Sequence, residues 1–212
     1  MAHHHFYRDE ARERAAKAVR EIEAKTAVQV VVALRARSDD GHAPDYLFGF
    51  LVSLAVLAAL VYLPIPFSLE AVPIDAMLAF IAGAFVCSRV APLRRLLTSR
   101  ERREAQVRRA ASAAFWEHGL SRTRRRLALL VFVSLFERRV ELILDTGVAP
   151  EALGEAWTAA AREIDASIAR PDIDRFIAAL GALGPILARA YPRGAGPVEE
   201  LPDEIDDEGG AA

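Results

Sequence analysis

A long run without charged residues places the strongest constraint on what this chain can fold into. Tyr46 to Phe67 contains no Asp, Glu, Lys or Arg over 22 positions, enough helix to cross roughly 30 Å of hydrocarbon. A second apolar segment, Val72 to Leu93, holds Asp75 and Arg89 towards its ends, where water or lipid headgroups can reach a charged side chain. The two segments predict a transmembrane hairpin, and a buried hairpin of a soluble protein is the alternative.

Apolar runs on both sides of this hairpin predict the strands of a soluble domain. Val28 to Leu34 is almost unbroken in β-branched and aliphatic residues, as in a strand covered on both faces. Leu127 to Phe136 and Arg139 to Asp145 are two further strands. A helical crossover makes the first two strands parallel, whereas the short link near Glu137 and Arg138 makes the second and third antiparallel.

Apolar residues at helical spacing predict helices around these strands. They cover Tyr7 to Lys25, a segment that follows the hairpin and ends at Gly119, Pro150 to Ala169, and Pro171 to Ala190. The expected fold class is therefore α/β, a small mixed sheet flanked by helices, with a two-helix transmembrane hairpin inserted after the first strand.

The expected organisation has four parts. Residues 1–44 supply the first helix and strand, 45–93 the hairpin, 94–192 the remainder of the α/β domain, and 193–212 an acidic flexible tail. The tail has too little apolar mass to fold alone. Insertion of a hairpin at a loop is tolerated where its entry and exit lie at one edge of a sheet.

Three segments carry a resemblance to a known family. They are "AVREIEAKTAVQVVVAL", "FWEHGLSRTRRRLALLVFVSLFERRVELILDTGV" and "ELPDEI". Together they resemble the TPM domain family, in particular its bacterial membrane-protein branch, although this chain has Arg126, Leu127 and Ala128 where the branch tends to read Arg-Thr-Gly. The resemblance implies an α/β sandwich and accessory or repair roles in membrane complexes. For some plant relatives it also implies metal binding and weak acid phosphatase activity.

Four carboxylates are the candidates for a metal site: Asp39, Asp40, Glu137 and Asp145. A hard cation needs several oxygens that converge on it. With the first two strands parallel, Asp39, Asp40 and Glu137 share one edge of the sheet, whereas Asp145 lies at the opposite edge. Solvated loop charge is the favoured interpretation of Asp39, Asp40 and Glu137, whereas Asp145, followed by Thr146 and Gly147, is interpreted first as part of a strand-ending turn. No cofactor is assigned, and a divalent cation is the one candidate.

The sequence supplies no motif that points to an enzyme. His42 and His118 have no nucleophile or carboxylate at a recognisable spacing, and Ser134 lies outside any GxSxG elbow. A non-enzymatic role is therefore favoured.

Basic residues cluster immediately after the second apolar segment: Arg94, Arg95, Arg102 and Arg103. Next to a membrane span, such a cluster is expected to attract anionic lipid headgroups. The expected partner of these arginines is therefore the bilayer and not nucleic acid.

Small residues recur four apart on both apolar segments. They are Ala55 and Ala59 on the first, and Ala79 and Gly83 on the second. This spacing lets helix backbones approach closely. We expect these positions to pack within the hairpin or between copies of the chain.

Arg35 and Arg37 precede the first span and Arg89, Arg94 and Arg95 lie at the end of the second, whereas the turn between the spans contains Glu70 and no basic residue. The positive-inside rule then predicts a two-span protein of the inner membrane with the α/β domain and both termini in the cytoplasm. The TPM resemblance favours the other side, where many such domains act. The expected function is a membrane-anchored interaction or accessory module that binds another membrane protein or itself. The alternative is a metal-dependent phosphatase of low activity.

Overall fold

The computed structural model describes residues 9–38, 41–62, 68, 70–170, 172–194 and 206–208. The chain divides into two compact units. One consists of residues 1–39 and 104–212 and holds the sheet, and the other consists of residues 40–103 and holds the hairpin. The hairpin unit is inserted between the first two strands, and it extends beyond the expected 45–93 at both ends.

The sheet has the order β3-β2-β1-β4. Its strands are β1 (Gln29–Arg35), β2 (Ala128–Ser134), β3 (Arg139–Leu144) and β4 (Asp206–Glu208). β1 runs parallel to β2, and β2 runs antiparallel to β3. The predicted mixed sheet is therefore confirmed.

β4 corrects the expectation of a tail that is flexible throughout. Its three acidic residues pair in parallel with Ala33, Leu34 and Arg35 of β1, so this part of 193–212 is a strand. Main-chain hydrogen bonds can add an extended segment to a sheet edge without any apolar core of its own. Residues 195–205 and 209–212 lie outside the described part of the chain.

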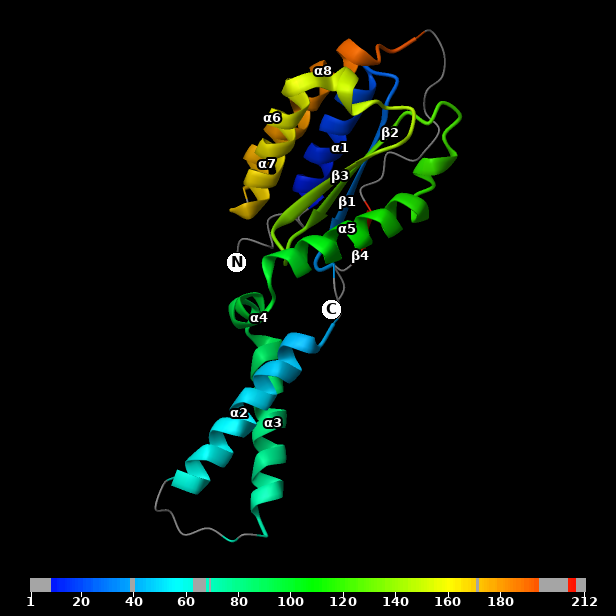
Figure 1. Cartoon of the computed structure of the whole chain (residues 1–212). Coiled ribbons are helices and arrows are strands. Elements are labelled where there is room, and N and C mark those ends of the chain that lie inside the picture. Colours follow the sequence, from blue (N-terminus) through cyan, green and yellow to red (C-terminus); the bar gives the residue numbers. More distant parts are fainter. Residues whose placement is uncertain are drawn as a thin grey trace. The chain divides into compact units, whose positions relative to one another are not determined.

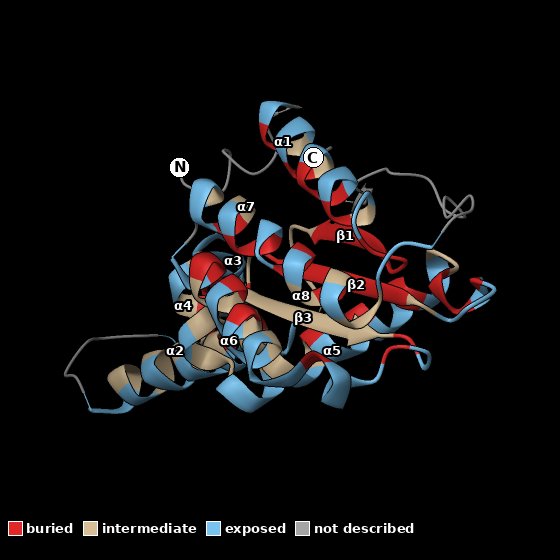
Figure 2. Cartoon of the chain, turned by 90° about the horizontal axis from the view of Figure 1, so that it is seen from above, coloured by how far each residue is buried: buried red, intermediate tan, exposed pale blue. Residues whose placement is uncertain are grey.

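Helices cover both faces of the sheet (Figure 1). One face carries α1 (Asp9–Glu23), α6 (Pro150–Ala169), α7 (Ile173–Gly181) and α8 (Leu183–Ala190), and the other carries α5 (Arg100–Glu117). Side chains of a strand alternate between its faces. Val30 and Val32 accordingly pack in the core under α1, whereas Val31 packs under α5. Figure 2 shows β1 and β2 as buried and β3 as half-buried.

The segment from Pro171 to Ala190, expected to form one helix, is two helices, α7 and α8, separated at Ala182. Pro185 has no N–H to donate to the carbonyl oxygen of Gly181, four residues earlier, so one helix cannot continue through this point. Gly181 and Gly184 weaken the helix further because glycine has a low helix propensity. A Cβ at Gly184 would lie 3.4 Å from the Ile22 side chain of α1, so the break coincides with a close approach of α1.

An ion pair connects α6 to α7. Arg175 donates from Nε and Nη2 to the two carboxylate oxygens of Glu163, at 2.6 and 3.1 Å. These hydrogen bonds lower the pKa of Glu163 below its usual value. The pair is exposed, so its contribution to stability is small.

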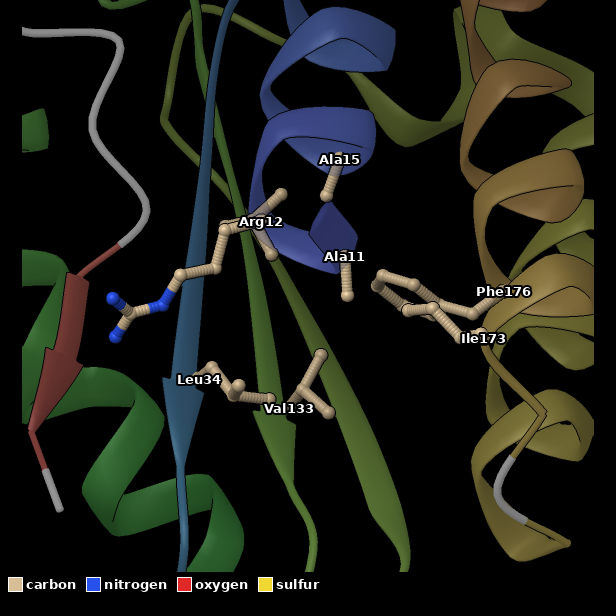
Figure 3. A pocket seen from close by; sticks show the side chains of 8 residues that line it. Ala11, Arg12, Ala15, Leu34, Val133, Ile173 and Phe176 are labelled. Carbon is tan, nitrogen blue, oxygen red and sulfur yellow. The ribbon is translucent and has the colours of Figure 1, made fainter. Parts of the chain in front are cut away.

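A small cavity of about 20 Å³ lies between α1, α7 and the sheet (Figure 3). Ala11, Leu34, Val133 and Phe176 are among its lining side chains, and the guanidinium of Arg12 points away from it. An apolar cavity of this size offers a water molecule too few hydrogen-bond partners, so it is expected to stay dry.

Filling this cavity should stabilise the α/β unit. Val133→Ile adds one methylene towards the cavity, and we expect it to raise the free energy of unfolding by up to about 0.8 kcal/mol. The control is Val131→Ile, on the same face of the same strand but away from the cavity, where overpacking should destabilise by about 1–3 kcal/mol. Denaturant unfolding followed by the fluorescence of Trp116 and Trp157 compares the two. A Val133→Ile variant as unstable as the control would contradict the prediction.

The hairpin unit consists of α2 (Ala43–Tyr62), α3 (Val72–Arg89) and α4 (Ala91–Leu97). α2 and α3 have mean hydropathies of 2.0 and 1.5, and only 11% of each apolar window is buried. Both helices are long and apolar enough to cross a membrane. The core helix of a soluble protein would be mostly buried, and these two are not.

Candidate functional site

Glu137 lies at the carboxyl end of β2, where β1 also ends. Its carboxylate is buried and accepts hydrogen bonds from the Ser38 backbone N–H, at 3.2 Å for the nearer oxygen, and from the Ser134 hydroxyl. Arg138, at the turn, has a positive φ of 54°, which suits the tight connection between two antiparallel strands. Glu137 therefore holds the chain that leaves β1 against the β2–β3 turn. Asp39 and Asp40 follow Ser38 but lie outside the described residues.

Asp145 lies at the opposite end of the sheet, because β3 runs antiparallel to β2. Its Oδ1 accepts from the Thr146 backbone N–H at 2.7 Å and is 3.7 Å from Nη1 of Arg126. A Cβ at Gly147 would lie 2.5 Å from the carbonyl oxygen of Arg126, so only glycine fits this turn. Asp145 thus orders a turn that packs tightly on the backbone before β2.

The structure does not bring Glu137 and Asp145 together. They lie at opposite ends of the strands, as the antiparallel pairing of β2 and β3 predicts. Among the described residues, no three His, Cys, Asp or Glu side chains gather where they could hold a metal ion. A site that includes Asp39 and Asp40 is outside what the structure describes.

A buried ion pair lies at the base of the hairpin. Nη2 of Arg94, on α4, is 3.5 Å from Oδ2 of Asp45, at the start of α2, and both side chains are no more than 5% exposed. Arg94 also donates to the carbonyl oxygen of Gly41. The Nδ1 of His42 lies 3.4 Å from the same carboxylate oxygen. The pair fixes α4 to the first turn of α2.

The place of Arg94 corrects one expectation from the sequence. Arg94 was expected to face lipid headgroups with Arg95, Arg102 and Arg103, but its guanidinium is buried against α2. The cause is Asp45, a charged residue directly before the apolar run, which a buried arginine can neutralise. Arg102 is exposed, and Arg95 and Arg103 are half-buried.

α2 and α3 cross at two glycines. A Cβ at Gly83 would lie 3.0 Å from the Cα of Gly49, and a Cβ at Gly49 would lie 2.6 Å from the carbonyl oxygen of Phe80. One helical turn further on, the hydroxyl of Ser53 donates to the carbonyl oxygen of Ala76 at 2.9 Å. The helix backbones therefore touch along this seam.

The expected packing residues differ in how far they are buried. Gly83 is buried in the seam, Ala59 and Ala79 are half-buried, and Ala55 is exposed. The α2 side of the seam is formed by Gly49 and Ser53, and Asp45, one helical turn before Gly49, pairs with Arg94 of α4. None of the three was among the expected packing residues. Their spacing of four was the signal that could have found them, because small and polar residues at that spacing share one face of a helix.

Comparisons with known proteins show the fold alone. No model of a protein family matches this chain, and no curated protein matches it. One similar solved structure is the NMR structure of the BA42 protein from the psychrophilic bacterium Bizionia argentinensis, with a TM-score of 0.57 and 13% sequence identity. The alignment covers 94% of each chain. At this identity the likeness supports the α/β architecture and no activity.

Proposed function

We propose that this chain is a membrane-anchored interaction module of the TPM type. The α2–α3 hairpin spans the inner membrane, and the α/β domain binds another membrane protein or a second copy of the chain, as an accessory to a membrane complex. The observation that carries the proposal is the exposure of two long apolar helices. Bulky apolar side chains such as Phe50, Leu54, Ile81 and Phe85 are 51–58% exposed, and soluble monomers rarely expose large contiguous apolar surfaces.

The polar contacts of the hairpin fit a bilayer. Backbone groups in hydrocarbon must be satisfied within helices, and α2 and α3 are continuous over 20 and 18 residues. Their charged residues are at helix ends, with Asp45 in the first turn of α2 and Asp75 and Arg89 in the first and last turns of α3. Between those ends the two helices present only uncharged side chains to lipid.

Charges placed in the middle of both helices test this proposal. Leu54 and Ile81 are exposed, so lysine there meets water if the chain is soluble, and hydrocarbon if the hairpin spans a membrane. Each lysine at the centre of a span costs about 2.5–3.5 kcal/mol of insertion free energy. We expect the double variant Leu54→Lys/Ile81→Lys to be absent from carbonate-washed membranes. The control is Leu96→Lys, at an exposed position of α4, which should remain in them. A protein that is soluble before any substitution would overturn the proposal.

Topology follows from the distribution of basic residues. We expect the turn with Ser68 to lie outside the cytoplasm and the α/β unit inside it, because basic residues remain on the cytoplasmic side of a span. Two cysteine reporters in a Cys87→Ser background test this prediction. One is Ser68→Cys in the turn, and the other is Thr158→Cys on α6, and both positions are exposed. An impermeant thiol reagent should label position 68 in intact cells and position 158 only after lysis. The reverse pattern would place the domain outside.

The metal-dependent phosphatase is not proposed, because no observation among the described residues favours it.

A further inference from the structure

β3 is an edge strand of the sheet, and its pairing fixes which backbone groups face outwards. The Asp145 N–H donates to the carbonyl oxygen of Ala128 at 2.9 Å, so Asp145 and every second residue before it direct their N–H and C=O groups to β2. In an antiparallel pair the residues between them point the other way. Val140, Leu142 and Leu144 therefore direct their backbone groups away from the sheet.

Only one end of this edge is covered. The carboxylate of Asp165, on α6, accepts from the Val140 N–H at 3.0 Å and from Nη1 of Arg139 at 2.9 Å. No residue in the described part of the chain bonds to the outward N–H or C=O of Leu142 or Leu144. Two donors and two acceptors are thus available along the remaining edge.

This open edge forms the floor of a groove of about 620 Å³ between α5 and α6. Arg108 and Ser112 of α5 form one wall, and Trp157 and Ala161 of α6 form the other. All six residues of β3 are half-buried (Figure 2), so the edge is recessed between two helices. A recessed edge accommodates a single extended chain, whereas a second copy of the sheet would bring its own flanking helices against α5 and α6.

The two walls determine which side chains such a strand would carry. The α6 side is apolar, with Trp157, Leu142 and Leu144 packed around the main core. On the α5 side the more exposed of the two charged side chains that line the groove is Arg108, at 75%, whereas its partner Glu141, at 3.4 Å, is 30% exposed. Side chains of an added strand alternate between the two walls, so apolar residues would face α6 and acidic residues would face Arg108.

The opposite edge of the same sheet offers a precedent. There the acidic residues of β4 pair with β1, so this sheet already accepts an acidic extended segment at one edge. We propose that the β3 groove is a docking site for an extended segment of a partner protein, with alternating apolar and acidic residues, which binds by strand addition. This inference rests on the proposed role as an interaction module and does not depend on membrane insertion.

Two labelled peptides test the proposal on the full chain in mild detergent. One is acetyl-Glu-Val-Glu-Leu-Glu-Val-Glu-amide, and the other carries Lys in place of every Glu. Fluorescence anisotropy should show tighter binding of the acidic peptide. Arg108→Glu should weaken the acidic peptide about tenfold and strengthen the lysine peptide, as expected when an exposed attractive pair becomes repulsive. The reversal of preference separates a binding effect from a loss of folding, because misfolding would weaken both peptides.

The backbone contact has its own matched pair of variants. Leu142→Pro removes an outward N–H without removing a bond to β2, and edge strands tolerate proline at such positions. Leu142→Ala keeps the N–H and loses only side-chain contacts. We expect the proline variant to bind at least about tenfold more weakly than the alanine variant, which corresponds to one lost hydrogen bond to a buried partner.

Several outcomes would overturn the docking site. Three concern the peptides: no binding of the acidic peptide, equal binding of both peptides, or the same affinity after Arg108→Glu. The fourth is a groove occupied by a second copy of the chain, which light scattering would detect as a dimer that Leu142→Pro dissociates. Membrane fractionation is a separate measurement, so a failed peptide test leaves the anchor in place, and a failed anchor test leaves the groove in place.

Discussion

Replacing Arg94 with alanine is expected to destabilise the hairpin unit by about 3–5 kcal/mol, the usual cost of leaving one partner of a buried ion pair uncompensated. The carboxylate of Asp45 would lose its only buried cation among the described residues. Gly41 would also lose the guanidinium that its carbonyl oxygen contacts. Hydrogen exchange followed by mass spectrometry measures the effect as faster exchange of the amides of α4 and the first turns of α2, because exchange reports local opening.

A matched control and a double variant separate charge from packing. Arg102→Ala removes an exposed arginine of the same unit and should change exchange little, since exposed charges contribute about 0–1 kcal/mol. Asp45→Leu/Arg94→Leu removes both charges and should recover most of the loss, because an apolar pair avoids the desolvation of two ions. If Arg94→Ala speeds the exchange of these amides no more than Arg102→Ala does, the ion pair does not stabilise the base of the hairpin.

The strands and their directions were predictable because the signals are local. Val28 to Leu34 and Leu127 to Phe136 are apolar runs of strand length, and the lengths of the connections decide between parallel and antiparallel pairing. β4 could not be predicted in this way. Its three residues are all acidic, and its stabilisation comes from backbone pairing with β1, which leaves no pattern in the side chains.

The contacts within the candidate site were less predictable because they depend on residues far apart in the sequence. Arg94 belongs to a basic cluster that resembles a headgroup-binding surface, and only the position of α4 against α2 shows that Asp45 is its partner. Small residues were expected at helix crossings, but alanine is abundant in this chain, so its spacing alone could not select a face of α2. The polar and glycine stripe of Asp45, Gly49 and Ser53 carries that information.

Gly83→Leu should separate α2 from α3. A Cβ at this position already lies 3.0 Å from the Cα of Gly49 and from the Val52 side chain, and backbone on the facing helix cannot move aside as a flexible side chain could. In the proposed bilayer there is no hydrophobic driving force between helices, so close packing of this kind is what would hold α2 and α3 together. We expect Gly83→Leu to lower the free energy of unfolding of the hairpin unit by about 3 kcal/mol or more, at the upper end of overpacking effects.

Ala82→Leu is the matched control for this variant, because Ala82 is the adjacent residue on α3 and is exposed. It adds a side chain of the same size to a surface that faces away from α2, so the amides of α2 and α3 should exchange as in the unmodified chain. In Gly83→Leu they should exchange faster on both sides of the Gly49 crossing. Since the close contact lies within one hairpin, the effect should not vary with protein concentration. Equal exchange in the two variants would show that α2 and α3 do not pack closely at Gly83. Faster exchange in Gly83→Leu that appears only at high protein concentration would show that Gly83 packs between copies of the chain.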